Sequence, residues 1–266
     1  MWIDDLAGLV NLRDVGGIPT ADGRSVVPGR LLRSDNLQDL TEADVRALLD
    51  RGLTDVVDLR SDYEAEMEGP GPLAEHPEVD IHQLSLFREW REGVGEEKPE
   101  EEEPPEALPG EALPWVDLEP SVQIGNDLAS HYLSYLVERP DSVLAALRVI
   151  AEAPGATLVH CAAGKDRTGT IVALALTLVG ADREAVIADY AASSERMQAI
   201  VDRLMTSTTY ADNLRGRPLS SHLTHPETMR ALLEHIDGEL GGVAVLLGKL
   251  GWTDEDTERL RTKLLG

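Results

Sequence analysis

The sequence lacks the cysteines of a disulfide framework, because only one of its 266 residues, Cys161, is a cysteine. An internal disulfide is therefore excluded, and a lone thiol is typical of a reducing compartment. Basic residues are also few: 24 Lys and Arg stand against 49 Asp and Glu, which gives a formal net charge of -25. A surface of this charge repels nucleic acid and anionic lipid at long range, and we expect no nucleic-acid partner. It repels phosphorylated molecules too, so any phosphate site must be formed locally.

Aromatic side chains and long apolar runs are scarce as well. Aromatic residues make up 4% of the chain, so Leu, Val, Ile and Ala must form most of the core. The longest apolar run, at 171–179, is too short to cross a bilayer. Residues 1–10 lack the basic and apolar regions of a signal peptide. We therefore expect a soluble, cytoplasmic protein without a membrane span.

One segment, 88–120, is acidic and rich in proline and cannot bury a core. Because strand-like runs lie on both sides of it, we interpret it as a mobile insertion within a single domain that spans 1–266. Its acidic run at 96–106 is either a solvated loop or an autoinhibitory mimic of phosphate.

The remaining sequence predicts an α/β fold. Short apolar runs at 54–59 and 156–160 are typical of buried parallel strands, and weaker candidates lie at 30–33 and 79–86. Helices are predicted at 41–51, with Thr41 as N-cap, and at 127–138, 142–152 and 168–179. The chain from 183 to 265 has a wholly helical pattern, so helical additions follow the strand-containing part.

The stretch HCAAGKDRTG, residues 160–169, carries the clearest chemistry. It joins a predicted strand to the N-terminus of a predicted buried helix, where unpaired amides and the helix dipole attract anions. Gly164 and Gly169 let the backbone turn its amides inward, and Arg167 supplies a planar fork for two phosphate oxygens. The same field favours the thiolate of Cys161 over the thiol and makes it a competent nucleophile. Thr168 can donate its hydroxyl to the sulfur.

The reaction that fits this loop is phosphoryl transfer to Cys161 followed by hydrolysis of the thiophosphate. His160 and Cys161 have no clustered partners, so they are a poor metal-ligand set, and no cofactor is expected. Two other classes of function remain open: a rhodanese-type sulfurtransferase, and a phosphopeptide-binding pseudophosphatase without catalytic activity.

HCAAGKDRTG resembles the H-C-x5-R-[ST] signature of the protein tyrosine phosphatase superfamily. NLRDVGG (11–17), GRLLRSDNL (29–37), TDVVDLRSDYE (54–64) and the C-terminal segment from GGVAVLLGKLGW onward are similar to the bacterial tyrosine phosphatase B type. The resemblance implies a cysteine-phosphatase fold, with a central, mostly parallel sheet flanked by helices. It implies that Cys161 is the nucleophile, that Arg167 binds phosphate, and that His160 orients the loop. The substrate-binding residues it implies are Ala162, Ala163, Gly164, Lys165 and Gly169. Secretion without a signal peptide is compatible with this group, and the oligomeric state stays open.

The general acid is not decided by the sequence. Asp166, within the loop, is favoured over Glu89, which follows the strand predicted at 79–86. Asp166 can instead orient Arg167 or Lys165 by ion pairing. By the resemblance, superfamily members that act on phosphoinositides often carry Lys in this loop, so Lys165 either attracts a second phosphate or is a solvated lysine.

Charged residues at the ends of strand-like runs lead to two further predictions. Asp14 and Arg60 are expected to brace the loop from behind, although surface ion pairs of little energy would show the same pattern. By resemblance, 181–225 forms a helical lid. Tyr190, Met197 and Ile200 have the spacing of one helix face, which fits either a lid or ordinary core.

Overall fold

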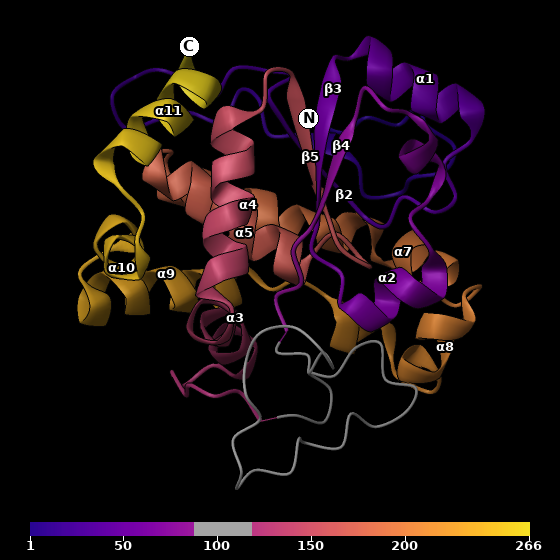
Figure 1. Cartoon of the computed structure of the whole chain (residues 1–266). Coiled ribbons are helices and arrows are strands. Elements are labelled where there is room, and N and C mark those ends of the chain that lie inside the picture. The colour runs from indigo at the N-terminus through magenta and orange to yellow at the C-terminus, as the bar shows by residue number, and fades with distance from the viewer. Residues whose placement is uncertain (88–118) are drawn as a thin grey trace, which may run out of the picture.

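The computed structural model describes residues 1–87 and 119–266 (Figure 1). Their centre is a five-stranded sheet in the order β1-β2-β5-β3-β4. The strands are β1 (Arg13–Asp14), β2 (Leu31–Ser34), β3 (Leu53–Asp58), β4 (Asp80–Gln83) and β5 (Ala156–His160). β2, β5, β3 and β4 run parallel, whereas β1 pairs with β2 antiparallel at one edge. The predicted α/β fold with a mostly parallel sheet is confirmed.

Strand β5 lies in the middle of the sheet, between β2 and β3. Ser34 at the end of β2 and Asp58 at the end of β3 both lie opposite His160 at the end of β5. The carboxyl ends of three strands therefore meet at one edge, which is where sites collect in parallel α/β sheets.

Successive strand residues point to opposite faces of the sheet, so each strand contributes to two cores. One core contains Leu31, Val57 and Val159 with side chains of α4 (Pro140–Glu152) and α5 (Asp166–Leu178). The other contains Leu32, Val56 and Leu158 with side chains of α1 (Glu42–Asp50). Helices consequently cover both faces of the sheet (Figure 1).

Helix α5 is the most deeply buried helix described: every residue except Thr177 is buried. This confirms the prediction that the helix is buried. It begins at Asp166, two residues earlier than the sequence pattern indicates, so Asp166 and Arg167 belong to its first turn.

Several helix starts follow from local sequence. Thr41 and Asp44 form a capping box at α1, and Thr253 and Asp256 form another at α11 (Asp254–Leu265). Asn126 caps α3 (Asp127–Glu138), whose bounds match the prediction. Helix α4 begins at Pro140 rather than at the predicted Ser142, since proline is well tolerated in the first turn.

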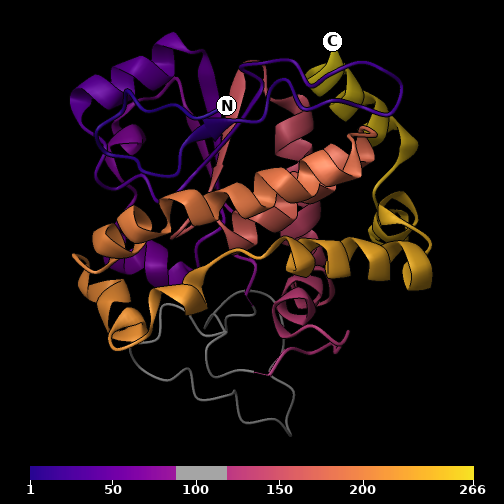
Figure 2. The same ribbon diagram turned by 180° about the vertical axis from the view of Figure 1, so that it is seen from behind.

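The C-terminal half is helical, as predicted. Its helices are α6 (Arg183–Ala191), α7 (Met197–Leu204), α8 (Thr208–Leu214), α9 (Pro226–Leu240), α10 (Val243–Leu250) and α11. α10 and α11 pack against α4 and α5, and α9 against α3, α6 and α10, whereas α7 and α8 lie at the opposite end of the molecule (Figures 1 and 2). In the described ranges, no helix combines the length and the apolar character needed to cross a membrane.

Two described elements are not predicted by the sequence analysis. β1 has only two residues, too few for a period-2 pattern. α2 (Asp62–Glu68) starts with a capping box of Ser61 and Glu64, a local signal that predicts a helix N-terminus. The described residues also contain three 3-10 turns, at Pro72–Glu75, Ala192–Arg196 and Leu219–His222.

The prediction that Tyr190, Met197 and Ile200 share one helix face is wrong. Tyr190 lies in α6, and the 3-10 turn Ala192–Arg196 separates it from Met197 and Ile200 in α7. Tyr190 joins the core around α5, and the other two join a smaller cluster. Of the insertion predicted at 88–120, residues 88–118 lie outside the described part of the chain, and so does Glu89.

Candidate active site

The loop between β5 and α5 carries the predicted nucleophile. Cys161 directly follows β5 and is 2% exposed. Gly164 has a φ of +67°, and a Cβ there would lie 2.2 Å from the carbonyl oxygen of Ser34. The loop therefore requires glycine at this position, both for its backbone conformation and for its approach to β2. We call residues 161–167 the signature loop.

Arg167 points back to the loop between β3 and α2, and its guanidinium is fully buried. Its Nη1 donates to Glu64 Oε2 at 2.5 Å and its Nη2 donates to Glu64 Oε1 at 3.0 Å. Nη1 also donates to Leu59 O at 3.1 Å, and the guanidinium carbon lies 4.9 Å from the centre of the Phe87 ring. Burial opposes the charge of Arg167, but Glu64 outweighs it and raises the pKa of Arg167 well above its usual value.

Glu64 is a residue of the candidate site that the sequence analysis misses. It is fully buried, and its Oε2 also accepts from the amide of Ser61, so one carboxylate caps α2 and holds Arg167. The Ser61–Glu64 capping box would have located α2, but its contact with Arg167 is a tertiary relation that no local pattern contains.

His160 and Arg60 lie behind the loop and meet at Asp58. Arg60 donates to both oxygens of Asp58, and Asp58 Oδ1 lies 3.5 Å from His160 Nε2. Burial lowers the pKa of His160 to about 4, so its imidazole is neutral at neutral pH. Burial also opposes the charge of Asp58, but His160 and Arg60 outweigh it and lower the pKa of Asp58.

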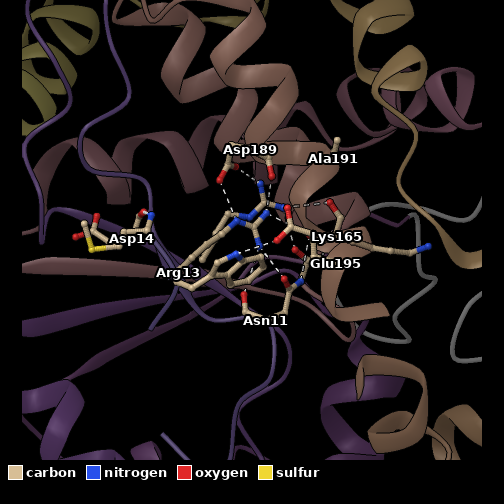
Figure 3. Close-up of polar contacts among 12 residues, drawn as sticks. Asn11, Arg13, Asp14, Lys165, Asp189, Ala191 and Glu195 are labelled. Carbon is tan, nitrogen blue, oxygen red and sulfur yellow. Dashed lines mark hydrogen bonds and ion pairs between the residues drawn. The ribbon is translucent and has the colours of Figure 1, made fainter. Parts of the chain in front are cut away.

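Asp14 was predicted to brace the signature loop, but its carboxylate binds elsewhere. Its carboxylate accepts from the amide of Gly16 at 2.7 Å and from the amide of Gly29 at 2.6 Å. It thus ties together two turns of the N-terminal segment. Figure 3 shows it apart from Lys165 in the signature loop. The reason is the antiparallel register of β1, which turns Arg13 rather than Asp14 toward α6.

Asp166 is buried at the N-terminus of α5 and contacts Tyr132 of α3. The hydroxyl of Tyr132 donates to Asp166 Oδ1 and lies 2.8 Å from the hydroxyl of Tyr190. Burial, followed by the charge of Asp166, raises the pKa of both tyrosines, so they stay protonated and can donate. Lys165 Nζ lies 3.6 Å from Asp166 Oδ2 and donates to His222 O at 2.6 Å.

Thr168 and Gly169 complete the first turn of α5. The hydroxyl of Thr168 is buried and has no hydrogen-bond partner among the residues that the structure describes, so the predicted bond to Cys161 is not made here. A Cβ on Gly169 would lie 2.8 Å from the Tyr190 ring, so glycine is needed for the packing of α6 on α5.

Helices α7 and α8 pack onto the signature loop. Ala162 and Ala163 belong to a small apolar cluster with side chains of these helices: Met197, Ile200, Val201, Leu204, Tyr210 and Leu214. In residues 1–87 and 119–266, no group of three His, Cys, Asp or Glu side chains is placed to hold a metal ion.

Cysteine and arginine at the two ends of one loop, between a central parallel strand and a buried helix, are the arrangement of cysteine-dependent phosphatases. Residues 4–266 match the model described as the tyrosine phosphatase family, so the chain belongs to that family and is a phosphatase. The triple specificity protein phosphatase PtpB of Mycobacterium tuberculosis is 30% identical over an alignment of 290 positions, which covers both chains completely. A tyrosine-protein phosphatase of Nostoc commune is 26% identical and aligns with 92% of this chain and 78% of its own length.

Proposed function

We propose that the protein hydrolyses phosphotyrosine through a phosphocysteine intermediate on Cys161. The observation that carries this proposal is the geometry of Arg167: Glu64 holds its guanidinium in a fixed orientation, and the loop that it closes begins at Cys161. A fixed fork of donors binds a phosphate more tightly than a mobile one, because less conformational entropy is lost.

The proposed reaction has two steps. The thiolate of Cys161 attacks phosphorus, an S–P bond forms, and the bond from phosphorus to the tyrosyl oxygen breaks while that oxygen takes a proton from a carboxylic acid. Water then attacks phosphorus, the S–P bond breaks, and inorganic phosphate leaves. The carboxylate takes the proton of the water, and the thiolate is restored.

Asp166 is the acid that we propose. Its position in the first turn of α5, at the end of the loop, supports this role, and the Tyr132 hydroxyl fixes its carboxylate from the other side. Glu89 stays the alternative.

We further propose that the enzyme accepts phosphoserine, phosphothreonine and phosphoinositides. The printed name of the M. tuberculosis relative, a triple specificity phosphatase, supports a broad range of substrates. Lys165 adds a cation to the loop, and it can bind a second phosphate if it leaves His222.

Residues 181–225 are proposed to act as a lid over the site. The packing of α7 and α8 on Ala162 and Ala163, together with the 2% exposure of Cys161, supports a closed state in which substrate cannot reach the sulfur. Substrate entry then requires these helices to move.

The test is phosphate release from phosphotyrosine, phosphoserine, phosphothreonine and phosphoinositide substrates, with Cys161→Ser as the blank. We expect the wild-type protein to release phosphate from phosphotyrosine and the Cys161→Ser variant to release none. Thiocyanate release without phosphate release would identify a sulfurtransferase instead. Binding of phosphopeptide with no hydrolysis of an activated aryl phosphate would identify a pseudophosphatase.

A further inference from the structure

The signature loop is held from outside by donors from the N-terminal part of the chain. These hydrogen bonds join Ala162 O to Asn36 N (3.0 Å), Ala163 O to Asn11 Nδ2 (2.8 Å), and Gly164 O to Arg33 Nη2 (2.9 Å). Arg33 Nη2 also lies 3.4 Å from Lys165 O. Successive carbonyls of the loop are thus turned toward β2 and the segment that precedes β1.

The direction of these carbonyls fixes the direction of the amides that bind anions. A trans peptide is planar, so its C=O and N–H point in opposite directions. With their preceding carbonyls held outside, the amides of Ala163, Gly164 and Lys165 point to the inner side of the loop. Inward amides are what an anion requires, so Asn36, Asn11 and Arg33 shape the phosphate site without contacting phosphate.

Arg33 is itself held by Asp189 of α6. Arg33 lies directly opposite Arg13 in the β1–β2 pair, where two like charges repel. Asp189 resolves this repulsion: its Oδ1 accepts from Arg13 Nε at 2.9 Å and its Oδ2 accepts from Arg33 Nη1 at 2.5 Å. The side chains of all three residues are at most 10% exposed.

Asp189 also orients the second donor, Asn11, through Arg13. Arg13 Nη1 donates to Asn11 Oδ1 at 2.7 Å, which leaves the amide nitrogen of Asn11 facing Ala163 O. Figure 3 shows Asn11, Arg13 and Asp189 pointing toward one another. Burial, followed by the charge of Arg33, lowers the pKa of Arg13 to about 10, so Arg13 is still charged at neutral pH.

We propose that Arg33 and Asn11 are positioning residues for catalysis and that Asp189 holds both: it aligns Arg33 directly and Asn11 through Arg13, and these two donors keep the amides of the signature loop turned toward the phosphate. This deepens the proposed function and depends on it for the identity of the anion. It also places a requirement for activity on α6, which belongs to the segment proposed as the lid.

The experiment uses the full chain and three variants. Arg33→Lys keeps the charge but loses the planar fork that joins Asp189 to Gly164 O. Asp189→Asn keeps the shape but leaves two arginines without a carboxylate. Asn11→Ala removes the donor to Ala163 O and leaves the charges of Arg13, Arg33 and Asp189 in place. For each variant we would measure kcat and KM on an aryl phosphate, inhibition by orthovanadate, affinity for inorganic phosphate by calorimetry, and the melting temperature.

We expect Arg33→Lys and Asp189→Asn to weaken orthovanadate and phosphate binding about tenfold or more and to lower kcat similarly, since each charged hydrogen bond contributes to anion binding. The pH dependence of kcat should keep its shape, because neither the nucleophile nor the acid is changed. Asn11→Ala should show the same effects at a smaller size.

Asp256→Asn is the matched control. Asp256 is a buried carboxylate paired with Arg148 at 3.2 Å, and it lies in α11. A purely structural effect would lower the melting temperature, as in this control, and leave anion affinity unchanged.

The proposal is overturned if the folded Arg33→Lys and Asp189→Asn proteins keep wild-type kcat and orthovanadate inhibition. Should neither fold, wild-type anion affinity in Asn11→Ala overturns it. Failure of the wild-type chain to release phosphate from any ester would instead contradict the proposed function, and calorimetry with inorganic phosphate would still decide whether these residues shape the anion site.

Discussion

Glu64 and Arg167 form a bidentate ion pair, with Nη1–Oε2 and Nη2–Oε1 distances of 2.5 and 3.0 Å, although more than a hundred residues separate them in the chain. Both side chains are at most 1% exposed. A bidentate pair of this kind fixes the plane of the guanidinium, and with it the direction of the donors at the end of the signature loop.

The first prediction concerns this pair. Glu64→Gln keeps the shape of the side chain but removes the charge and one acceptor, so Arg167 should lose its fixed plane. We expect kcat/KM to fall by roughly 10- to 100-fold, which corresponds to ~1.4–2.7 kcal/mol of transition-state stabilisation. The melting temperature should fall as well, because a buried charge is left without its partner.

Glu66→Gln on the same helix is the control, since Glu66 is exposed, and it should leave both quantities unchanged. Wild-type kcat/KM in Glu64→Gln would show that the orientation of Arg167 does not depend on Glu64.

The second prediction concerns stability in acid. His160 has a pKa of about 4 in the folded protein, below the ordinary value of 6.5, chiefly because of burial. The unfolded chain therefore binds a proton on this residue at a higher pH than the folded protein. The resulting stability is fully present above about pH 6.5 and is lost as the pH falls toward 4, with a total of about 3 kcal/mol.

Urea unfolding at a series of pH values tests this directly. The free energy of unfolding of His160→Gln should fall less than that of the wild type between about pH 6.5 and pH 4. His225→Gln, at an exposed position, should follow the wild type. Parallel curves for wild type and His160→Gln would contradict the assignment of this acid sensitivity to His160.

The third prediction concerns Tyr132. Tyr132→Phe removes the donor to Asp166 and keeps the ring. If Asp166 is the acid, a misplaced carboxyl slows the first step, which kcat/KM reports, only when the leaving group needs a proton. We expect kcat/KM to fall about tenfold or more for phosphotyrosine, whereas kcat/KM on an activated aryl phosphate with a good leaving group should be little affected.

Asp166→Asn should show the same dependence on the leaving group with a larger loss, and Tyr63→Phe, at an exposed position of α2, should show none. An equal loss on both substrates in Tyr132→Phe would mean that Tyr132 acts on the whole loop rather than on a proton transfer.

The parts of the fold that the sequence predicts are those with strong local periodicity or caps. β5 and α3 match their predicted bounds, and α1 starts at its predicted N-cap Thr41. The short strand β1 was beyond such reasoning, because its two residues become a strand only through pairing with β2.

The site shows the same division between local and tertiary information. Cys161, Gly164 and Arg167 lie within seven residues of the chain, so their spacing alone indicates an anion-binding loop. Glu64, which contacts Arg167, and Asp189, which contacts Arg33, come from elements that lie far away in the sequence. Arg13 and Asp14 are neighbours in the chain, and only the register of β1 decides which of them faces Asp189.

The fourth prediction concerns phosphoinositides. Lys165 Nζ donates to His222 O, so it must leave this carbonyl to bind a second phosphate. Lys165→Ala should lower kcat/KM on a phosphoinositide about tenfold more than on phosphotyrosine, since only the lipid headgroup carries a neighbouring dianion. Lys249→Ala, at an exposed position of α10, should change neither. An equal loss on both substrates in Lys165→Ala would show that Lys165 raises only the local potential.

The last prediction concerns access to Cys161. Cys161 is 2% exposed, and the cluster that includes Ile200 and Tyr210 packs on its loop neighbours Ala162 and Ala163, so a bulky alkylating reagent should react slowly while iodoacetamide reacts fast. Ile200→Ala leaves a cavity in this cluster and loosens α7 on the loop, which should raise the rate with the bulky reagent about tenfold. Leu48→Ala makes a comparable cavity in α1, within the core on the opposite face of the sheet, and should not change that rate. If both cavities accelerate the bulky reagent equally, access depends on general loosening of the fold, and α7 and α8 do not act as a lid.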